Sequence, residues 1–277
     1  MKRKKYTGER LETHEQGEGM IEHLHRYAIA SQNCSGKIVL DIASGEGYGS
    51  ALLASVALKV TGVDIDGETV RLANEKYAAG RSNLEFVRGS ADAIPADAAA
   101  FDVVVSFETI EHHDKHEEMM SEIKRVLKPE GLLIISSPDK LYYSDKPGTK
   151  NPFHIKELYK EEFRSLLNKH FKNVSLYRQK AFFSSVMVPD DKNSSDSIQL
   201  YHGNYSMIAE EENIESVYLV ALASDNQFEK PGSSLFRDYE FLSNLRRRFE
   251  STARFQFGNM VLNPIQFFKQ KFSSRKK

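Results

Sequence analysis

The sequence predicts an α/β fold in which a mostly parallel sheet carries helices on both faces. Three observations support this. Strand-like and helical patterns alternate between residues 37 and 137 of the 277. The strand-like stretches are rich in Val and Ile and almost continuously apolar, as strands buried on both faces are. The first stretch also ends in a glycine-rich loop from which a helix starts, a common arrangement at ligand sites of such sheets.

The predicted elements follow one another in an order that fits this class. A helix over 15–31 comes first, with Ile21, Leu24, Tyr27 and Ala28 near one face. Strands and helices then alternate, with strands predicted at 37–42, 59–65, 83–88, 101–106 and 131–137, and helices at 48–57, 67–79 and 114–127.

The second half of the chain predicts a loop over 139–152, helical spacing over 155–167, and last strands over 173–177 and 216–223. Between those strands, 184–213 is polar and predicts an irregular surface excursion or lid. Leu235 to Phe249 predicts one more helix. We therefore divide the chain into an N-terminal cap (1–34), a core domain (35–223, with 184–213 as an irregular insertion) and a basic, partly helical tail (224–277).

The composition describes a globular protein. Hydrophobic residues make up 40% of the chain, which suffices for a core, and no apolar run reaches the roughly 18 residues that span a membrane. No apolar stretch follows the basic N-terminus, so a signal peptide is not expected. The single cysteine, Cys34, excludes an internal disulfide and fits a reducing compartment. These features predict a cytoplasmic protein without a transmembrane segment.

The charge is unevenly distributed. The net charge is −1, yet residues 237–277 hold ten Lys and Arg against three Asp and Glu, which leaves the remainder acidic. The tail either folds as a solvated segment along the acidic body or meets an anionic partner or surface. Its apolar residues pack on the core, in a homodimer, on a glycosyltransferase partner or at the inner face of the membrane. Packing on the core or in a dimer is the simpler interpretation.

The loop after the first strand predicts the ligand. Asp41 ends the strand, and Gly45, Gly47 and Gly49 let the backbone turn tightly beside a ligand. Asp64 ends the second strand, where a carboxylate can accept hydrogen bonds from both ribose hydroxyls. The acidic surroundings disfavour a pyrophosphate because like charges repel. They suit a cationic nucleoside without phosphates, and S-adenosylmethionine is such a ligand.

The chain resembles the class I S-adenosylmethionine-dependent methyltransferases. Besides the loop, Phe101 to Glu108 is similar to the family's fourth strand, and Arg125 to Ile135 to its Arg-Val-Leu-Lys-Pro-Gly-Gly signature, with Glu130 in place of the first glycine. The resemblance implies a Rossmann-like, doubly wound sheet of seven strands whose last two form an antiparallel edge hairpin.

The resemblance and the loop together predict the cofactor-binding residues. Asp64 is expected to hold the ribose and Ile65 to flank the adenine. The segment after the third strand lies near the adenine amine in the family, although Ser90 stands where many members have Asp. For Asp92, a contact with the adenine amine and a role as a loop carboxylate or helix cap are equally good interpretations. The full predicted set is Asp41, Ala43, Gly45, Gly47, Asp64, Ile65, Ala91, Asp92 and Phe107.

A second constellation follows the fourth strand. Glu108, Glu111 and His112, with His154 from a later loop, resemble the metal-binding segment of the small-RNA 3′-terminal 2′-O-methyltransferases, which implies Mg²⁺ or Mn²⁺. Glu-His at this point is also common in family members without a metal. His112 would then be a general base, or the segment would serve structural hydrogen bonding. The predicted catalytic residues are His112, Glu111 and His154.

The remaining motifs narrow the expected acceptor. Several of them together resemble a bacterial subgroup associated with surface-polysaccharide biosynthesis, which implies methylation of a hydroxyl on a sugar, either of a nucleotide-sugar or of a surface glycan. RNA ribose 2′-O-methylation is a rival, although the acidic body argues against nucleic acid. A non-catalytic S-adenosylmethionine-binding scaffold of a glycan-assembly complex is another. The motifs are Thr7 to Arg10, His25 to Tyr27, Gly45 to Ser50, Ser106 to His112 and Asn151 to His154, and the segments expected to face the substrate are Tyr6 to Arg10, Glu22 to Tyr27 and Leu141 to Tyr143.

Overall fold

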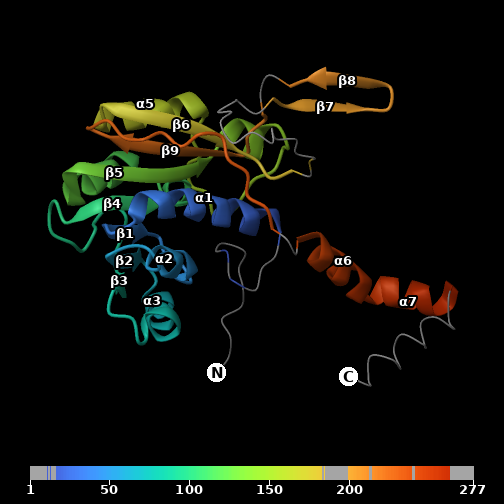
Figure 1. Cartoon of the computed structure of the whole chain (residues 1–277), viewed down its shortest axis with the longest axis horizontal. Helices are drawn as coiled ribbons and strands as arrows, with labels where there is room; N and C mark the ends of the chain where they lie inside the picture. The colour runs from blue at the N-terminus through green and yellow to red at the C-terminus, as the bar shows by residue number, and fades with distance from the viewer. Residues whose placement is uncertain are drawn as a thin grey trace, which may run out of the picture. The chain divides into compact units, whose positions relative to one another are not determined.

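The computed structural model describes residues 11, 13, 17–182, 184, 199–211, 214–238 and 241–262. The chain divides into two compact units, Met1–Phe236 and Arg237–Lys277. The first holds the sheet, and the second holds the helices α6 (Phe241–Ser251) and α7 (Ala253–Leu262) (Figure 1).

The central sheet has seven strands in the order β3-β2-β1-β4-β5-β9-β6. Strands β1 to β5 run parallel, whereas β9 is antiparallel to both β5 and β6, so the sheet has the expected antiparallel edge. The chain order reverses between β1 and β4, which places a crevice at the carboxyl ends of these two strands. The strands are β1 (Ile38–Ile42), β2 (Lys59–Asp64), β3 (Leu84–Arg88), β4 (Phe101–Ser106), β5 (Leu127–Pro138), β6 (Asn173–Gln179) and β9 (Tyr218–Ser224).

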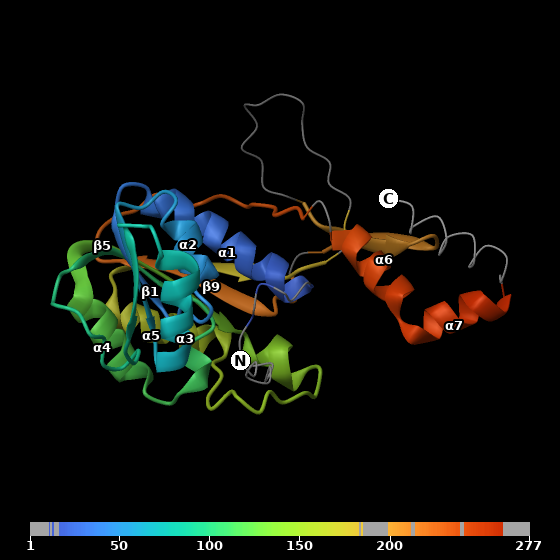
Figure 2. The ribbon, with the colours of Figure 1, turned by 90° about the horizontal axis from the view of Figure 1, so that it is seen from below.

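Helices cover both faces of the sheet (Figure 2). One buried cluster joins the strands to α4 (His116–Val126) and α5 (Lys160–His170). The other joins them to α1 (Glu18–Cys34), α2 (Tyr48–Leu53) and α3 (Gly67–Ala73). Burial on both faces explains the continuous apolarity of the strands, since successive side chains of a strand pack alternately into one cluster and the other. The mostly parallel seven-stranded fold expected from the sequence is confirmed.

Helix limits differ from the sequence prediction at several ends. Helix α1 begins at Glu18, after Gly17, and continues to the buried Cys34. Helix α5 begins at Lys160, not 155, because the Glu162 carboxylate accepts the Tyr159 N–H at the first turn and the preceding residues belong to a loop. That loop brings His154 to the site described below.

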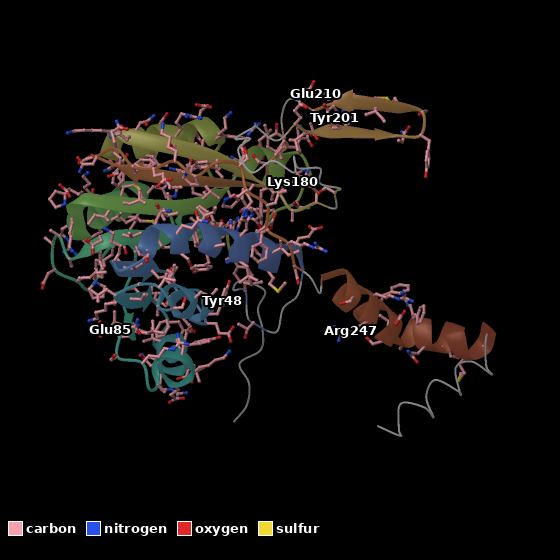
Figure 3. All side chains as sticks on the ribbon, viewed as in Figure 1. Tyr48, Glu85, Lys180, Tyr201, Glu210 and Arg247 are labelled. Carbon is pink, nitrogen blue, oxygen red and sulfur yellow. The ribbon has the colours of Figure 1, made fainter. Side chains whose placement is uncertain are left out.

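Part of the segment predicted to be irregular is a hairpin. Strands β7 (Tyr201–Asn204) and β8 (Met207–Glu210) pair antiparallel, with Tyr201 opposite Glu210 (Figure 3). The expectation of irregular structure over 184–213 is therefore wrong for 201–210. Of the other residues in that range, most lie outside the described residues.

The first unit extends beyond residue 223, where the sequence suggests the core domain ends. Asp225 pairs with Lys124 at 2.5 Å, and the His25 imidazole hydrogen-bonds to the Ser234 hydroxyl at 2.8 Å. Of the helix expected over 235–249, the part from Phe241 is the helix α6, while 235–238 is not helical and 239–240 lie outside the described residues. In the described segments, no helix combines the length and apolarity that a membrane crossing requires.

Candidate active site

A cavity of about 460 Å³ opens at the carboxyl ends of β1, β2 and β4, where the strand order reverses. Its wall combines the loop after β1, the ends of β2 and β3, the segment after β4, and side chains of α1. Seven of the nine predicted cofactor residues line it: Ala43, Gly45, Asp64, Ile65, Ala91, Asp92 and Phe107.

The loop after β1 is held in an unusual backbone conformation. Ala43 has φ 56° and Gly45 φ 54°, in the left-handed region that non-glycine residues rarely adopt. The Asp64 carboxylate stabilises this shape, because one oxygen accepts the Gly45 N–H at 3.0 Å while the other accepts the Asp66 N–H at 2.9 Å. Asp64 thus ties the loop to the end of β2 and presents its carboxylate at the cavity wall.

Asp41 and Gly47 lie behind this wall. Asp41 is 1% exposed and accepts hydrogen bonds from the Ser50 hydroxyl at 2.6 Å and the Tyr27 hydroxyl at 3.4 Å. Burial raises its pKa to about 7. A Cβ on Gly47 would come within 2.7 Å of the Phe86 ring, so only glycine fits there. Both residues support the loop without being part of the cavity surface.

Asp92 has charged and polar partners at the cavity edge. Lys115 Nζ donates to one carboxylate oxygen at 2.6 Å, and the Ser90 hydroxyl donates to the other. The Lys115 hydrogen bond, followed by that of Ser90, lowers the Asp92 pKa to about 2. Asp92 is therefore an ionised carboxylate paired with Lys115, at the position where the sequence places an adenine contact.

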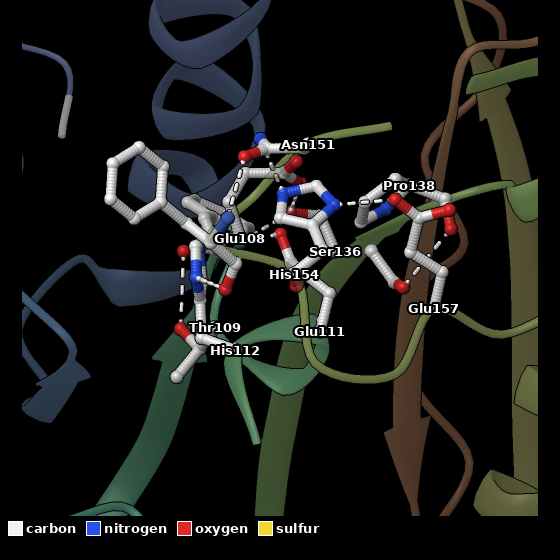
Figure 4. Close-up of polar contacts among 12 residues, drawn as sticks. Glu108, Thr109, Glu111, His112, Ser136, Pro138, Asn151, His154 and Glu157 are labelled. Carbon is white, nitrogen blue, oxygen red and sulfur yellow. Dashed lines mark hydrogen bonds and ion pairs between the residues drawn. The ribbon is translucent and has the colours of Figure 1, made fainter. Parts of the chain in front are cut away.

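Glu108, which follows β4, is held by a buried cation. Its carboxylate accepts hydrogen bonds from Arg26 at 2.8 Å and from the Ser136 hydroxyl at 2.6 Å (Figure 4). Arg26 is 2% exposed and lies over the rings of Phe107 and Tyr218. Glu108 also has φ 50°, so this side chain is held at a strained backbone position.

Three of the four predicted metal ligands come together. Glu111, His112 and His154 each offer a ligand atom, and these atoms lie within 4.8 Å of one another. Glu111 is 1% exposed, and neither carboxylate oxygen has a hydrogen-bond partner among the described residues. Burial, followed by the nearby Glu108 charge, raises the pKa of Glu111 well above its usual range. Glu108 is instead engaged with Arg26.

His112 belongs both to this cluster and to the cavity wall. Its Nδ1 lies 3.1 Å from the Phe153 carbonyl oxygen. A carbonyl can only accept, so Nδ1 carries the proton, and in the neutral ring Nε2 carries the lone pair. The loop that supplies Phe153 and His154 is joined to the same turn, because Ile155 and Lys156 both donate to the Glu111 carbonyl.

The donor set fits a divalent ion. Among the described residues nothing donates a hydrogen bond to the buried Glu111 carboxylate, whose Oε1 lies 4.0 Å from His112 Nε2, and a cation beside it would offset the cost of its burial. Two imidazoles with one carboxylate suit Mn²⁺ better than Mg²⁺, which prefers oxygen ligands. The cavity likewise suits the nucleoside of S-adenosylmethionine, because the carboxylate of Asp64 lies in its wall at the end of β2.

The cavity wall also includes residues that are absent from the predicted cofactor-binding and catalytic sets. The buried Ser44 hydroxyl lines the cavity and has no hydrogen-bond partner among the described residues. Ser44 lies between Ala43 and Gly45, which the sequence predicts to bind the cofactor, so its position in the sequence already indicated a place in the cavity wall. His23 also lines the cavity and contacts the Tyr48 hydroxyl at 3.0 Å. The sequence does not distinguish His23 from its neighbour Glu22. The packing of α1 places His23 in the cavity wall, whereas Glu22 accepts the Ala181 N–H.

Parts of the chain are similar to known methyltransferases. Residues 40–135 match a family model described as a methyltransferase domain. A probable S-adenosylmethionine-dependent methyltransferase of Mycolicibacterium smegmatis is 37% identical over 142 residues, covering 51% of this chain and 54% of that protein. A phthiotriol/phenolphthiotriol dimycocerosates methyltransferase of Mycobacterium leprae is 32% identical over 113 residues, covering 40% and 41%.

The fold is shared with solved structures. A S-adenosylmethionine-dependent methyltransferase of Thermotoga maritima superposes with a TM-score of 0.52 at 17% identity, covering 75% of this chain and 91% of that one. The chain spans about half the length of the first curated relatives it matches. The sheet order, the glycine-rich loop and the match over residues 40–135 thus make this part of the chain similar to S-adenosylmethionine-dependent methyltransferases.

Proposed function

We propose that this chain transfers a methyl group from S-adenosylmethionine to a hydroxyl acceptor, a sugar of a nucleotide-sugar or surface glycan. One observation carries the proposal: a single cavity has Asp64 and the glycine-rich loop in its wall together with His112. A donor-binding acid and a group able to take a proton thus share one space, as methyl transfer to an alcohol requires.

On the donor side, bound S-adenosylmethionine supplies a methyl group already activated by its positive sulfur. The chain has to bind and orient it. Asp64 would accept hydrogen bonds from the ribose, Ile65 would flank the adenine with its exposed apolar side chain, and Ala43 to Gly45 would surround the methionine part.

On the acceptor side, a hydroxyl has a high pKa and has to lose its proton. His112 donates from Nδ1 to the Phe153 carbonyl, so its neutral ring offers Nε2 as a base. Alternatively, Glu111, His112 and His154 hold Mn²⁺ or Mg²⁺, which would lower the pKa of an oxygen bound to it. The two roles exclude each other, because the same lone pair cannot bind a metal and accept a proton.

Chelation distinguishes these roles. If a metal is held, chelation abolishes turnover and Mn²⁺ restores it. If His112 is the base, chelation has no effect and His112→Ala slows turnover by about 10²–10⁴-fold. His170→Ala is the control, since His170 lies on α5 and bonds to Glu117. Turnover that survives both chelation and His112→Ala contradicts both roles.

The acceptor is tested by mass spectrometry of sugars, nucleotide-sugars and lipid-linked glycans after incubation with the protein and S-adenosylmethionine. A lipid alcohol belongs in the panel because one relative is named a phthiotriol methyltransferase. An RNA oligonucleotide tests ribose methylation, which the acidic sequence outside the tail disfavours. Binding of the cofactor without turnover on any of these acceptors would favour the scaffold function instead.

The tail adds a proposal about location. Residues 237–277 are basic, and exposed Phe249, Phe257 and Val261 lie on its helices. We expect this unit to contact a second copy, a glycosyltransferase or the anionic inner face of a membrane, which would keep the cytoplasmic domain near its glycan acceptor.

A further inference from the structure

His154 has a buried carboxylate on its far side from the metal-ligand cluster. Its Nδ1 lies 2.6 Å from a Glu157 carboxylate oxygen, and the two side chains are only 7% and 8% exposed (Figure 4). Glu157 is three residues further along the same loop and is not among the site residues predicted from the sequence. A hydrogen bond this short and this buried holds a ring in one orientation.

The neighbours of His154 define which nitrogen carries the proton. The Asn151 side-chain oxygen accepts the Phe153 N–H at 3.0 Å, so its NH₂ group faces His154 Nε2 at 2.9 Å and donates to it. A carboxylate at Nδ1 calls for a proton there, and an NH₂ at Nε2 calls for a lone pair. Both partners therefore select the same neutral tautomer.

The ring plane is also determined. Tyr143 stacks on the His154 ring at 5.1 Å between centroids and 27° between planes, while the His112 ring meets it edge-on at 5.1 Å. The backbone bonds from Ile155 and Lys156 to the Glu111 carbonyl anchor the loop itself. With Nδ1 committed to Glu157, the remaining lone pair of the ring is on Nε2, and an ion held by Glu111 and His112 would take the place of the Asn151 N–H donor there.

We infer that Glu157 is a positioning residue that acts through His154, fixing its Nδ1–H tautomer and ring orientation so that Nε2 serves as a metal ligand. The metal part of this inference rests on the proposed function; the tautomer part stands on the geometry alone. Carboxylate–histidine–metal arrangements of this kind raise the basicity of the ligand, and loss of the carboxylate weakens metal binding roughly 10- to 100-fold.

Two measurements on the full chain test it. Imidazole ¹⁵N spectra of the metal-free protein, with His154 assigned by its loss in His154→Gln, should show the Nδ1–H tautomer. In Glu157→Ala only the neutral Asn151 amide still selects this tautomer, so the share of the Nε2–H form should rise. Calorimetry with Mn²⁺ should show an affinity about 10- to 100-fold lower in Glu157→Ala. Glu157→Gln, whose amide oxygen still accepts from Nδ1–H, should keep the tautomer and most of the affinity.

The matched control is Glu117→Ala, which removes the carboxylate bonded to His170 on the surface and should change neither measurement. An unchanged His154 tautomer in a folded Glu157→Ala would overturn the inference, as would equal losses in Glu157→Ala and Glu157→Gln. If the wild type binds no Mn²⁺ but Glu157→Ala loses the tautomer, the metal site of the proposed function fails while the positioning role holds.

Discussion

Three buried acids of the site have three different environments. Asp64 accepts backbone N–H groups at the cavity wall, Asp41 accepts hydroxyls behind it, and Glu111 lies beside two imidazoles. Burial raises the pKa of Asp41 and Glu111, the latter further because of Glu108. In the proposed function the same side-chain chemistry would therefore serve ligand binding, loop support and metal or proton chemistry according to its partners.

Replacing Asp64 with Ala should weaken S-adenosylmethionine binding by about 1–3 kcal/mol, the cost of leaving hydroxyl donors without an acceptor. Titration calorimetry measures this. The control is Asp66→Ala, which removes the cap of the Glu68 N–H at the start of α3 and should lower stability but not affinity. Equal affinity in Asp64→Ala and wild type would exclude the assigned ribose contact.

Asp41 should make stability depend on pH. Its pKa is about 7 in the folded protein, whereas the ordinary value of 3.8 applies to the exposed side chain of the unfolded chain. Between these values the folded state binds more protons than the unfolded state, so the free energy of unfolding decreases as the pH rises. Asp41→Asn should lack this decline. Urea unfolding of the cofactor-free proteins from pH 4 to 7 measures it, and parallel curves for the two proteins would contradict the expectation.

At the scale of elements, α1 and α2 meet at a glycine. A Cβ on Gly49 would lie 1.9 to 2.5 Å from ring atoms of Tyr27, whose hydroxyl also reaches Asp41. Helix packing thus requires a glycine at position 49, whereas the sequence pattern suggested that the ligand requires it. The contact matters for function because α1 also supplies Arg26 and His23 to the site.

Gly49→Ala should therefore destabilise the fold by about 1–3 kcal/mol, since a packed interface has to shift to admit the methyl group. Denaturant unfolding gives the value. Gly19→Ala is the matched control: it lies in α1 with nothing within 4 Å of its added Cβ, and should stabilise by up to about 1 kcal/mol. A Gly49→Ala protein as stable as this control would show that α1 does not pack on α2 as described.

At the scale of the whole molecule, the division into two units leads to a truncation experiment. Ending the chain after Phe236 should leave S-adenosylmethionine affinity unchanged, because the sheet and cavity lie within the first unit. Ending it after Ala223 should lower stability, since Ser224 and Asp225 bond to Gly131 and Lys124. Thermal melts and calorimetry of both proteins decide. If the protein that ends after Phe236 no longer bound S-adenosylmethionine, the tail would be part of the functional fold.

Much of this molecule follows from local patterns. The alternation of apolar strands with helices predicted the parallel sheet, because buried strands need continuous apolarity whatever surrounds them. Asp64 and the loop after β1 were predicted since strand ends and glycines determine backbone position locally. The antiparallel edge of β6 and β9 followed from the family resemblance, because periodicity alone does not determine strand direction.

The sequence alone determined which acids and imidazoles are available near the carboxyl ends of the strands, and packing decided their partners. Glu108 and Glu111 are equally suited to a metal by spacing, yet Arg26 from α1 holds Glu108 and leaves Glu111 buried beside His112. The contact of Glu157 with His154 depends on the tertiary fold, because the loop that holds both residues is bonded to the Glu111 carbonyl. These pairings join residues distant in the chain, so their energies depend on burial and tertiary geometry that no local pattern contains.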